Sequence, residues 1–517
     1  MNAAIRTIKS SSDIDKEPHS IEQSGTRGLT KASRLGALGL LGISSLLMTG
    51  CLVGPNYQRP KIDAPALYRQ QRAAEQASFA DLPWWQVFKE ETLRSLIQTA
   101  LANNYDLRVA VTRIEQARAV AAQARSQYFP MIDYQAQISG QQNAFTSLLS
   151  PGEFRSLGLG LITAAWELDL WGRIRRSNEA ALADLLATEE ARRGVTLSLV
   201  SDVAQAYIEL LGLDRELEVA KSNQISFQRT LDIFTDRLRG GVASKLETDR
   251  AGGAEATVSA SIPELERQIA LKENQINVLL GNNPGAVPHT DKLLDNVIPP
   301  QIPVGLPSAL LERRPDIMQA EQNVRAANAQ IGVATANFFP QIGLTAFYGR
   351  VSVPLEDITR GSANAVSIAG TATGPIFQGG LLRARKRQAV AAWQENVLTY
   401  QQTTLNAFQE VANLLVSREK YEQIRTEQLR AEQVYLDAVD VATQRYVAGK
   451  ASYYEVLEAQ QQLYPVQVSL AQTETNRRTV VVQLYRSLGG GWNLPGANWT
   501  PPPGTIPTPA PAPKPQP

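Results

Sequence analysis

The chain has 517 residues, with 51 basic and 50 acidic side chains and a formal net charge of +1. This near-zero charge argues against a nucleic-acid binder, because neutralising phosphates requires an excess of Lys and Arg. One cysteine and two histidines exclude a disulfide scaffold and a metal site built from several Cys and His ligands. After residue 51 no apolar run reaches the roughly 18 residues that a membrane helix needs, which excludes a polytopic transporter.

The amino terminus is predicted to be a lipoprotein signal peptide that covers residues 1–50. Leu35–Met48 is an apolar run of 14 residues preceded by basic residues, and it is typical of a secretory signal. Leu47–Cys51 resembles a bacterial lipobox, so we expect a covalent lipid on Cys51 and no other cofactor. A buried or incidental cysteine is the alternative. Because Leu52 stands where an inner-membrane retention signal would have aspartate, this resemblance implies the outer membrane.

Beyond the signal peptide, the chain contains an internal duplication. Asp106–Pro130 matches Asp316–Pro340 at a constant offset of 210 residues, and two later matches have an offset of 208. Chance similarity between Ala- and Gln-rich helices could explain one match, but not three in order. The later matches are Arg237–Ser244 with Arg445–Ser452 and Leu280–Gly281 with Leu488–Gly489.

The duplication predicts two structural repeats, at residues 89–286 and 307–492. Each repeat should contain a helix, two strands, a very long helix, a turn and a second helix. The long helix at about 381–446 lies in a proline-free stretch of good helix formers, and would be on the order of 100 Å long. Such a helix needs lateral partners, which favours a bundle or a coiled-coil cylinder. The remaining segments are an N-terminal lipidated segment at 51–88, a linker at 287–306 and a Pro-rich disordered tail at 493–517.

The predicted strands lie at about 130–145, 157–171, 340–352 and 363–376. After Pro130 and Pro340, apolar and polar residues alternate, which gives one apolar and one polar face. The pattern leaves two interpretations open: surface hairpins on a soluble protein, or membrane barrel strands with the apolar face toward lipid. Four strands cannot close a barrel, and an open edge in lipid leaves backbone groups unsatisfied. Membrane strands would therefore be pooled, and three chains would supply 3 × 4 = 12 of them.

Six groups of short motifs, in order along the chain, carry a family resemblance. They are Cys51–Pro60 (CLVGPNYQRP), Trp84–Trp85 with Ala100–Leu101 and Asp106–Leu107, Trp166–Arg173 (WELDLWGR), Arg313–Ile317 (RRPDI) with Phe338–Pro340, Gly374–Gly380 (GPIFQGG) and Leu488–Trp492 (LGGGW). Each motif alone is a weak pattern, but the ordered set is specific. The set resembles the outer membrane factor family, the TolC-like channels, and specifically the lipoprotein branch found in RND-type tripartite efflux systems.

The resemblance implies a mostly α fold with a small transmembrane β part. It implies a homotrimer whose 12-stranded β-barrel sits on a long α-helical periplasmic tunnel. The implied function is a passive export duct, lipid-anchored in the outer membrane and extending into the periplasm. The implied partners are a periplasmic adaptor protein, an inner-membrane RND-type transporter and outer membrane lipid.

In this family the tunnel closes at the turns between its long helices, and these tips contact the adaptor. The resemblance therefore assigns adaptor contacts at both tips, although plain helical-hairpin turns would explain the same residues. Glycine permits the backbone reversal, and serine can cap the next helix. The assigned residues are Gly240, Gly241, Ser244, Gly449 and Ser452.

Glu455 and Glu458 lie just beyond the second tip, where similar channels carry acidic constriction rings. Separated by three residues, they share one helix face, and three chains would stack them into two cation-favouring rings. An ordinary solvated helix face is the alternative. Tyr446 and Glu247 map near a pair that in similar proteins latches the second hairpin to the first. The predicted periplasmic gate therefore comprises these four residues.

The chain is not expected to be an enzyme. The sequence has no nucleophile motif, no phosphate-binding Gly-rich loop, no HExxH and no Cys cluster. The energy for transport must then come from a partner. A non-channel outer-membrane lipoprotein, acting as a coiled-coil structural tether, is the alternative function.

Overall fold

A computed structural model of the protein describes residues 52–69, 71, 78–141, 155–289 and 303–491. The chain forms two compact units, Met1–Cys51 and Leu52–Pro517, and all described residues belong to the second. The predicted signal peptide, the lipid site at Cys51, the Pro-rich tail and part of the linker lie outside the described residues. Among the described residues, no helix is long and apolar enough to cross a membrane.

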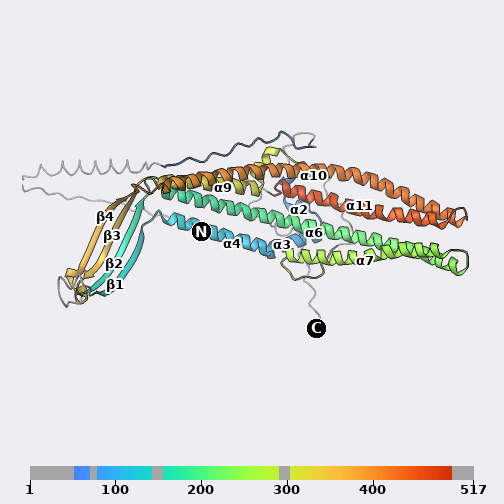
Figure 1. The fold of residues 1–517 in the computed structure, drawn as a ribbon, viewed down its shortest axis with the longest axis horizontal. Coiled ribbons are helices and arrows are strands. Elements are labelled where there is room, and N and C mark those ends of the chain that lie inside the picture. The colour runs from blue at the N-terminus through green and yellow to red at the C-terminus, as the bar shows by residue number, and fades with distance from the viewer. Residues whose placement is uncertain (1–51, 70, 72–77, 142–154, 290–302, 492–517) are drawn as a thin grey trace, which may run out of the picture. The chain divides into compact units, whose positions relative to one another are not determined.

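The elements form two series with the same order of helices and strands (Figure 1). The first series is η1 (Phe79–Asp81), α2 (Trp84–Val87), α3 (Glu91–Asn103), α4 (Tyr105–Ser126), β1 (Met131–Gln141), β2 (Arg155–Leu168), α6 (Arg173–Arg239) and α7 (Lys245–Leu279). The second series is η2 (Pro307–Ala309), α8 (Leu310–Arg313), α9 (Pro315–Ala336), β3 (Gln341–Ser352), η3 (Leu355–Thr359), η4 (Gly361–Ala363), β4 (Asn364–Thr373), α10 (Leu381–Val447) and α11 (Tyr453–Ser487).

Corresponding helices of the two series have equal lengths. The helices α4 and α9 each have 22 residues, α6 and α10 each have 67, and α7 and α11 each have 35. At 1.5 Å per residue, the two longest helices are about 100 Å long. The duplication found in the sequence is therefore a duplication of structure, and the predicted long helix is confirmed as α10.

Two prolines lie inside helices, which a simple proline rule would not predict. Pro263 is inside α7 and Pro465 is inside α11. Each removes one backbone hydrogen bond, because proline has no N–H. Packing of α7 against α6, and of α11 against α6 and α10, offsets this loss, since tertiary contacts supply most of the stability of protein helices.

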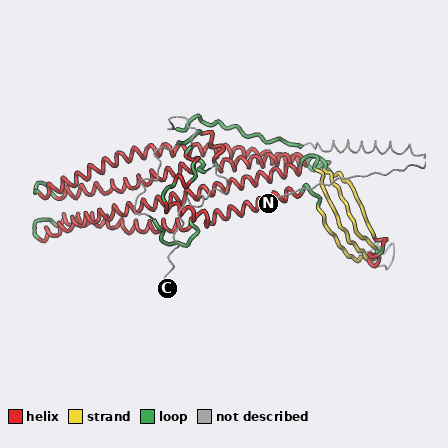
Figure 2. The backbone as a smooth tube through the Cα atoms, turned by 180° about the vertical axis from the view of Figure 1, so that it is seen from behind, coloured by secondary structure: helices red, strands yellow, loops and turns green. Residues whose placement is uncertain are grey.

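The helix α6 is central to the packing. It contacts α4 and α9 toward the strands, and α7 and α11 toward the helix turns, while α10 contacts α9 and α11 (Figure 1). The main core forms around its middle, where Trp84, Tyr207 and Tyr485 are fully buried. The Tyr485 hydroxyl donates to the Leu82 carbonyl at 3.0 Å, which fixes the N-terminal helices against α11. Both turns between long helices lie at the end opposite the strands (Figure 2).

The four strands form one antiparallel sheet in the order β1–β2–β3–β4. The register aligns Ile132 with Ala164, Ala164 with Ala346 and Ala346 with Ile368, so the predicted apolar residues of β1 and β3 share one face. This face is exposed: Tyr134 is 86% exposed and Ile368 85%. A soluble protein rarely leaves so much apolar surface uncovered, which favours membrane strands over soluble hairpins. Other exposed apolar residues on this face are Ile138, Ile162, Tyr348 and Val366.

An N-terminal strap, residues 52–69, crosses from the first repeat to the second. Arg176 of α6 is 1% exposed and donates to the carbonyls of Val53 (3.4 Å) and Gly54 (3.5 Å) and to Oδ1 of Asn56 (2.8 Å). Gly54 also lies against Gly332 of α9, where a Cβ on Gly54 would come within 2.5 Å of the Gly332 Cα. The strap is therefore held between the two repeats, beginning beside the strand ends.

Farther along the strap, polar side chains continue the contact with α9. The Tyr57 hydroxyl donates to Glu321 at 3.1 Å, and Arg59 pairs with the same carboxylate at 2.9 Å. Burial and the charge of Glu321 raise the pKa of Tyr57 to about 12, so its hydroxyl keeps the proton that it donates. The strap is thus fixed by buried as well as by surface contacts.

We predict that Gly332→Ala loosens the strap. The new Cβ would lie 2.7 Å from the Cγ of Arg176, so the arginine must shift, at a cost of roughly 1–3 kcal/mol. The thermal unfolding midpoint should fall, and limited proteolysis within the strap should accelerate. The control is Gly253→Ala in α7, where a Cβ meets nothing within 4 Å and the helix should gain about 0.5–1 kcal/mol. Equal proteolysis of both variants would contradict the clamp.

Candidate functional site

Two tight turns connect the long helices, one in each repeat. After α6, Gly241 has a φ of +72°, and after α10, Gly449 has a φ of +68°. In each turn this glycine and the next residue donate backbone hydrogen bonds to the last helical turn, a common glycine C-cap. These bonds are Gly241 to Leu238 (3.0 Å), Val242 to Arg237 (2.9 Å), Gly449 to Tyr446 (2.9 Å) and Lys450 to Arg445 (2.9 Å). Gly240, in contrast, has a φ of −79° and corresponds to Ala448, so no left-handed backbone requires glycine there.

The helices that follow the turns begin with equivalent serines but are capped differently. At the start of α7, the Ser244 hydroxyl accepts from the Glu247 N–H, and the Ser244 N–H donates to Oε2 of Glu247 at 2.7 Å. The same four-residue pattern recurs as Ser452 to Glu455, yet Ser452 makes no side-chain cap hydrogen bond. The structure thus gives Glu247 a local capping role and leaves Glu455 outside such a cap.

Tyr446 links the second hairpin to the first through an arginine. The Arg237 guanidinium of α6 donates to the Tyr446 hydroxyl, and its carbon lies 5.2 Å from the centre of the Tyr446 ring. The same ring packs edge-on against Tyr453 at 4.6 Å. In a single chain, therefore, the partner of Tyr446 across the hairpins is Arg237, while Glu247 is engaged in its own helix cap.

Tyr453 is a tip residue that sequence reasoning missed. It is 7% exposed, its hydroxyl donates to Thr230 at 2.6 Å, and its ring packs against Phe234 at 4.5 Å. Burial raises the pKa of Tyr453. An aromatic residue at a helix start cannot be told from an ordinary core residue by pattern. Comparing the repeats gives a signal, because the equivalent position in the first repeat is Lys245.

Glu455 and Glu458 differ in their electrostatic surroundings. One Glu455 oxygen lies 3.7 Å from the Arg445 guanidinium, and both side chains are about half exposed (43% and 55%). Such an exposed pair contributes at most about 1 kcal/mol. Glu458 is exposed and has no ion-pair or hydrogen-bond partner among the described residues. Both glutamates point away from the helix face that buries Val456 and Leu457, because they lie half a turn from it.

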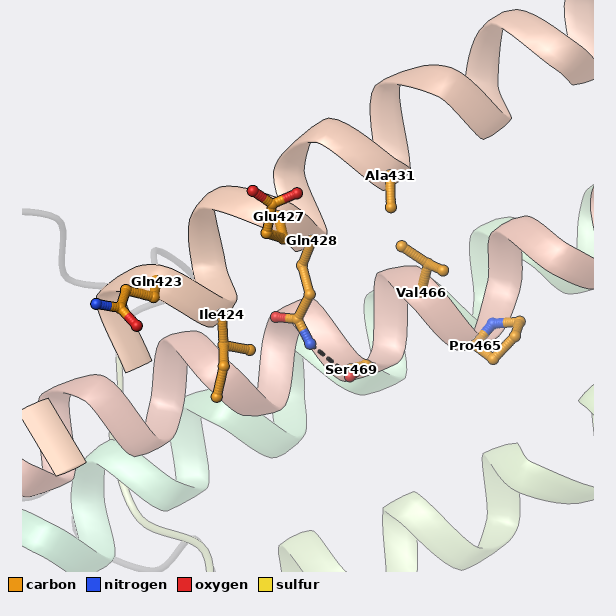
Figure 3. Close-up of a pocket in the computed structure, with 8 residues that line it drawn as sticks. All are labelled: Gln423, Ile424, Glu427, Gln428, Ala431, Pro465, Val466 and Ser469. Atoms are coloured by element: carbon orange, nitrogen blue, oxygen red, sulfur yellow. Dashed lines mark hydrogen bonds between the residues drawn. The ribbon is translucent and has the colours of Figure 1, made fainter. Parts of the chain in front are cut away.

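A groove of about 670 Å³ opens between α10 and α11 beside Pro465 (Figure 3). Across it, the Gln428 amide donates to the Ser469 hydroxyl at 2.7 Å. The groove lies along the helix pair and contains none of the predicted gate residues. It is lined by Gln423, Ile424, Glu427, Gln428, Ala431, Pro465, Val466 and Ser469. Within the described ranges, no group of three His, Cys, Asp or Glu residues is placed to bind a metal.

Comparisons with known proteins identify the family. The model of the outer membrane efflux protein family matches residues 96–282 and 306–490. The chain is 36% identical over 460 residues to the solvent efflux pump outer membrane protein SrpC of Pseudomonas putida, covering 87% of this chain and 97% of that protein. It is 32% identical over 456 residues to the cation efflux system protein CusC of Escherichia coli, with the same coverage of 87% and 97%. The solved structure of the outer-membrane channel OprN matches with a TM-score of 0.78 and 31% identity, covering 86% of this chain and all of that chain.

The chain therefore belongs to the outer membrane efflux protein family. The family resemblance and the predicted fold class are confirmed, and the two matched ranges fall in the two structural repeats. The protein is an outer membrane channel component of an efflux system, which is a transport role.

We predict that the tips tolerate alanine at one glycine and not at its neighbour. Gly241→Ala and Gly449→Ala each force an L-residue to positive φ, which costs about 1–2 kcal/mol. Gly240→Ala should be neutral or slightly stabilising, because the second repeat already has Ala448 at this position. Hydrogen exchange of the last turns of α6 and α10 measures the difference. Equal protection in all three variants would contradict the left-handed turns.

Proposed function

We propose that three copies of the chain assemble into a passive export duct. The observation that carries this proposal is the four-stranded sheet, which has an exposed apolar face and no further strand beyond β1 or β4 in the described residues. In lipid, each unpaired backbone group would cost several kcal/mol. Because the two edge strands run antiparallel to each other, β4 of one copy can pair with β1 of the next. Three copies then give 3 × 4 = 12 strands, enough for a barrel with a lumen.

The helices would form the periplasmic part of the same duct. On α10, Leu398 and Leu405 are each 65% exposed, and on α4, Val109 and Val120 are 46% and 54% exposed. In a trimer, α10 of one copy would lie beside α4 and α7 of the next, which would cover these side chains. Twelve helices in one layer would then enclose a tunnel that continues from the barrel.

We assign the tips to contact with a periplasmic adaptor protein, and the supply of solute and energy to an inner-membrane RND-type transporter. The adaptor would contact the residues assigned at both turns: Gly240, Gly241, Ser244, Gly449 and Ser452. SrpC is named for solvent efflux and CusC for cation efflux, although both resemble this chain to a similar extent. This supports a duct of broad use whose cargo is selected by the transporter.

We assign the periplasmic gate to the second tip. Three copies of Glu455 and Glu458 would form two acidic rings at the closed end. The link from Tyr446 to Arg237 would hold the second hairpin inward, with Tyr453 packed beneath it. Glu247 contributes by capping α7 and so fixing the neighbouring turn.

We also assign a lipid to Cys51. The clamped strap supports this, because the Val53 N–H donates to the Trp171 carbonyl at 3.2 Å, just past the end of β2. A lipid on the residue before Leu52 would then enter the membrane beside the sheet.

The gate predicts unequal effects of the two glutamates on conductance. In planar bilayers the wild-type channel should give small, cation-selective currents. Glu458→Gln should enlarge them and lower the cation preference by about fivefold, the equivalent of roughly 1 kcal/mol. Glu455→Gln should have a smaller effect, because Arg445 already offsets that charge. Glu427→Gln, in α10 far from the tip, is the matched control and should behave as wild type.

Two results would refute this assignment. A monomeric mass in mild detergent, together with no current in any variant, would favour a structural tether. Currents that change equally for Glu427→Gln and Glu458→Gln would place the constriction elsewhere.

The lipid assignment predicts that Cys51→Ser abolishes incorporation of radiolabelled palmitate. The wild-type chain, expressed in parallel, should incorporate the label. A label that persists on Cys51→Ser would show that another residue carries it.

A further inference from the structure

A cluster of cations occupies the start of α10, immediately after the last membrane strand. Arg383, Arg385, Lys386 and Arg387 are all exposed. None has an ion pair or a side-chain hydrogen bond among the described residues. Glu395 is the first acidic residue after them in the helix. The cluster thus concentrates four positive charges within five residues.

The equivalent start of α6 in the first repeat is neutralised. There Arg173 pairs with Glu167 (2.7 Å), Arg175 with Asp169 (3.1 Å) and Arg176 with Glu179 (2.7 Å). At an offset of 208, the three carboxylates correspond to other residue types in the second repeat. These are Pro375, Phe377 and Arg387. The second repeat has therefore lost every local counter-charge and gained a cation.

The helix itself does not favour this arrangement. The N-terminal end of a helix carries a partial positive charge, so cations in its first turns are destabilising. Like charges three and four residues apart also repel one another on the helix surface. An external anion would relieve both effects.

Apolar residues place the cluster at the level of the membrane surface. Between β4 and α10, Ile376 and Phe377 are 103% and 87% exposed. The turn is fixed nearby, because Gly374 packs on Pro340, whose carbonyl accepts from Trp171 at 2.8 Å. Exposed apolar and aromatic residues at the end of a membrane strand are typical of the interface with lipid headgroups.

Three of the four cations share one side of α10. Arg383, Lys386 and Arg387 are three and four residues apart, whereas Arg385 points elsewhere. Lys386 is seven and eleven residues before Trp393 and Val397, so it lies in their helical stripe. Those two residues pack in the cluster that contains the strap tyrosines, Tyr57 and Tyr68. The cations therefore lie on the side of α10 that carries the N-terminal strap.

We propose that Arg383, Lys386 and Arg387 bind the phosphates of anionic phospholipids in the periplasm-facing leaflet of the outer membrane, with Ile376 and Phe377 seated among the upper acyl chains. The proposal uses the outer membrane location of the family. It depends neither on the trimer nor on the gate.

Native mass spectrometry of the full chain in detergent tests this site. The wild-type chain should bind phosphatidylglycerol about tenfold better than phosphatidylethanolamine, a preference that three cations near a lipid surface can supply. The triple variant R383Q/K386Q/R387Q should lose that preference. The control R113Q/R229Q/K420Q removes three exposed cations elsewhere, so it has the same net charge and should keep the preference. Circular dichroism verifies that both variants retain their helix content.

Three outcomes would overturn the proposal. Equal binding of the two lipids by the wild type, or a preference that persists in the triple variant, would remove the site. Complete displacement of phosphatidylglycerol by equimolar inorganic phosphate would identify a site for free phosphate instead. Loss of an oligomeric mass in the triple variant alone would mean that the cations pair with carboxylates of a second copy.

Discussion

Hydrogen bonding at the two edges of the sheet is the constraint on which the rest of the architecture depends. β1 has 11 residues and β4 has 10, and in one chain each is paired on one side only within the described sheet. Because the apolar face suits lipid, the outer side of each edge strand must find backbone partners without water. Neighbouring copies are the simplest source. The direction of β4 also sets the start of α10, and so the wall in which the tips lie.

The duplication builds this wall from two nearly equal halves, and later differences give the halves separate roles. Helix lengths agree residue for residue, since packing around α6 requires equal hairpins. Charges do not agree. Glu247 caps its helix while the equivalent Glu455 faces Arg445, and the first repeat has Arg250 where the second has Glu458. At the other end, carboxylates of the first repeat are replaced around the α10 cations. The second repeat therefore carries both the acidic tip and the basic membrane end.

The strap joins the two halves where the duplication alone leaves them unconnected. Arg176 is almost fully buried, and its side chain is satisfied by the strap backbone, Asn56 and Glu179. A buried guanidinium without such partners would be strongly destabilising. The strap and the arginine are thus mutually dependent, and their contact fixes the chain just after Cys51 against the ends of the strands.

The sequence by itself determined the duplication, the long helices, the strands and the tip turns, because these depend on local periodicity, helix propensity and glycine backbone freedom. It also located Glu455 and Glu458 beyond the tip. Only the tertiary structure decided which side chains meet: Arg237 rather than Glu247 at Tyr446, Thr230 at Tyr453, and the strap at Arg176. These partners are between 120 and 223 residues apart in the chain. Such contacts depend on how helices pack side by side, which no local pattern of residues specifies.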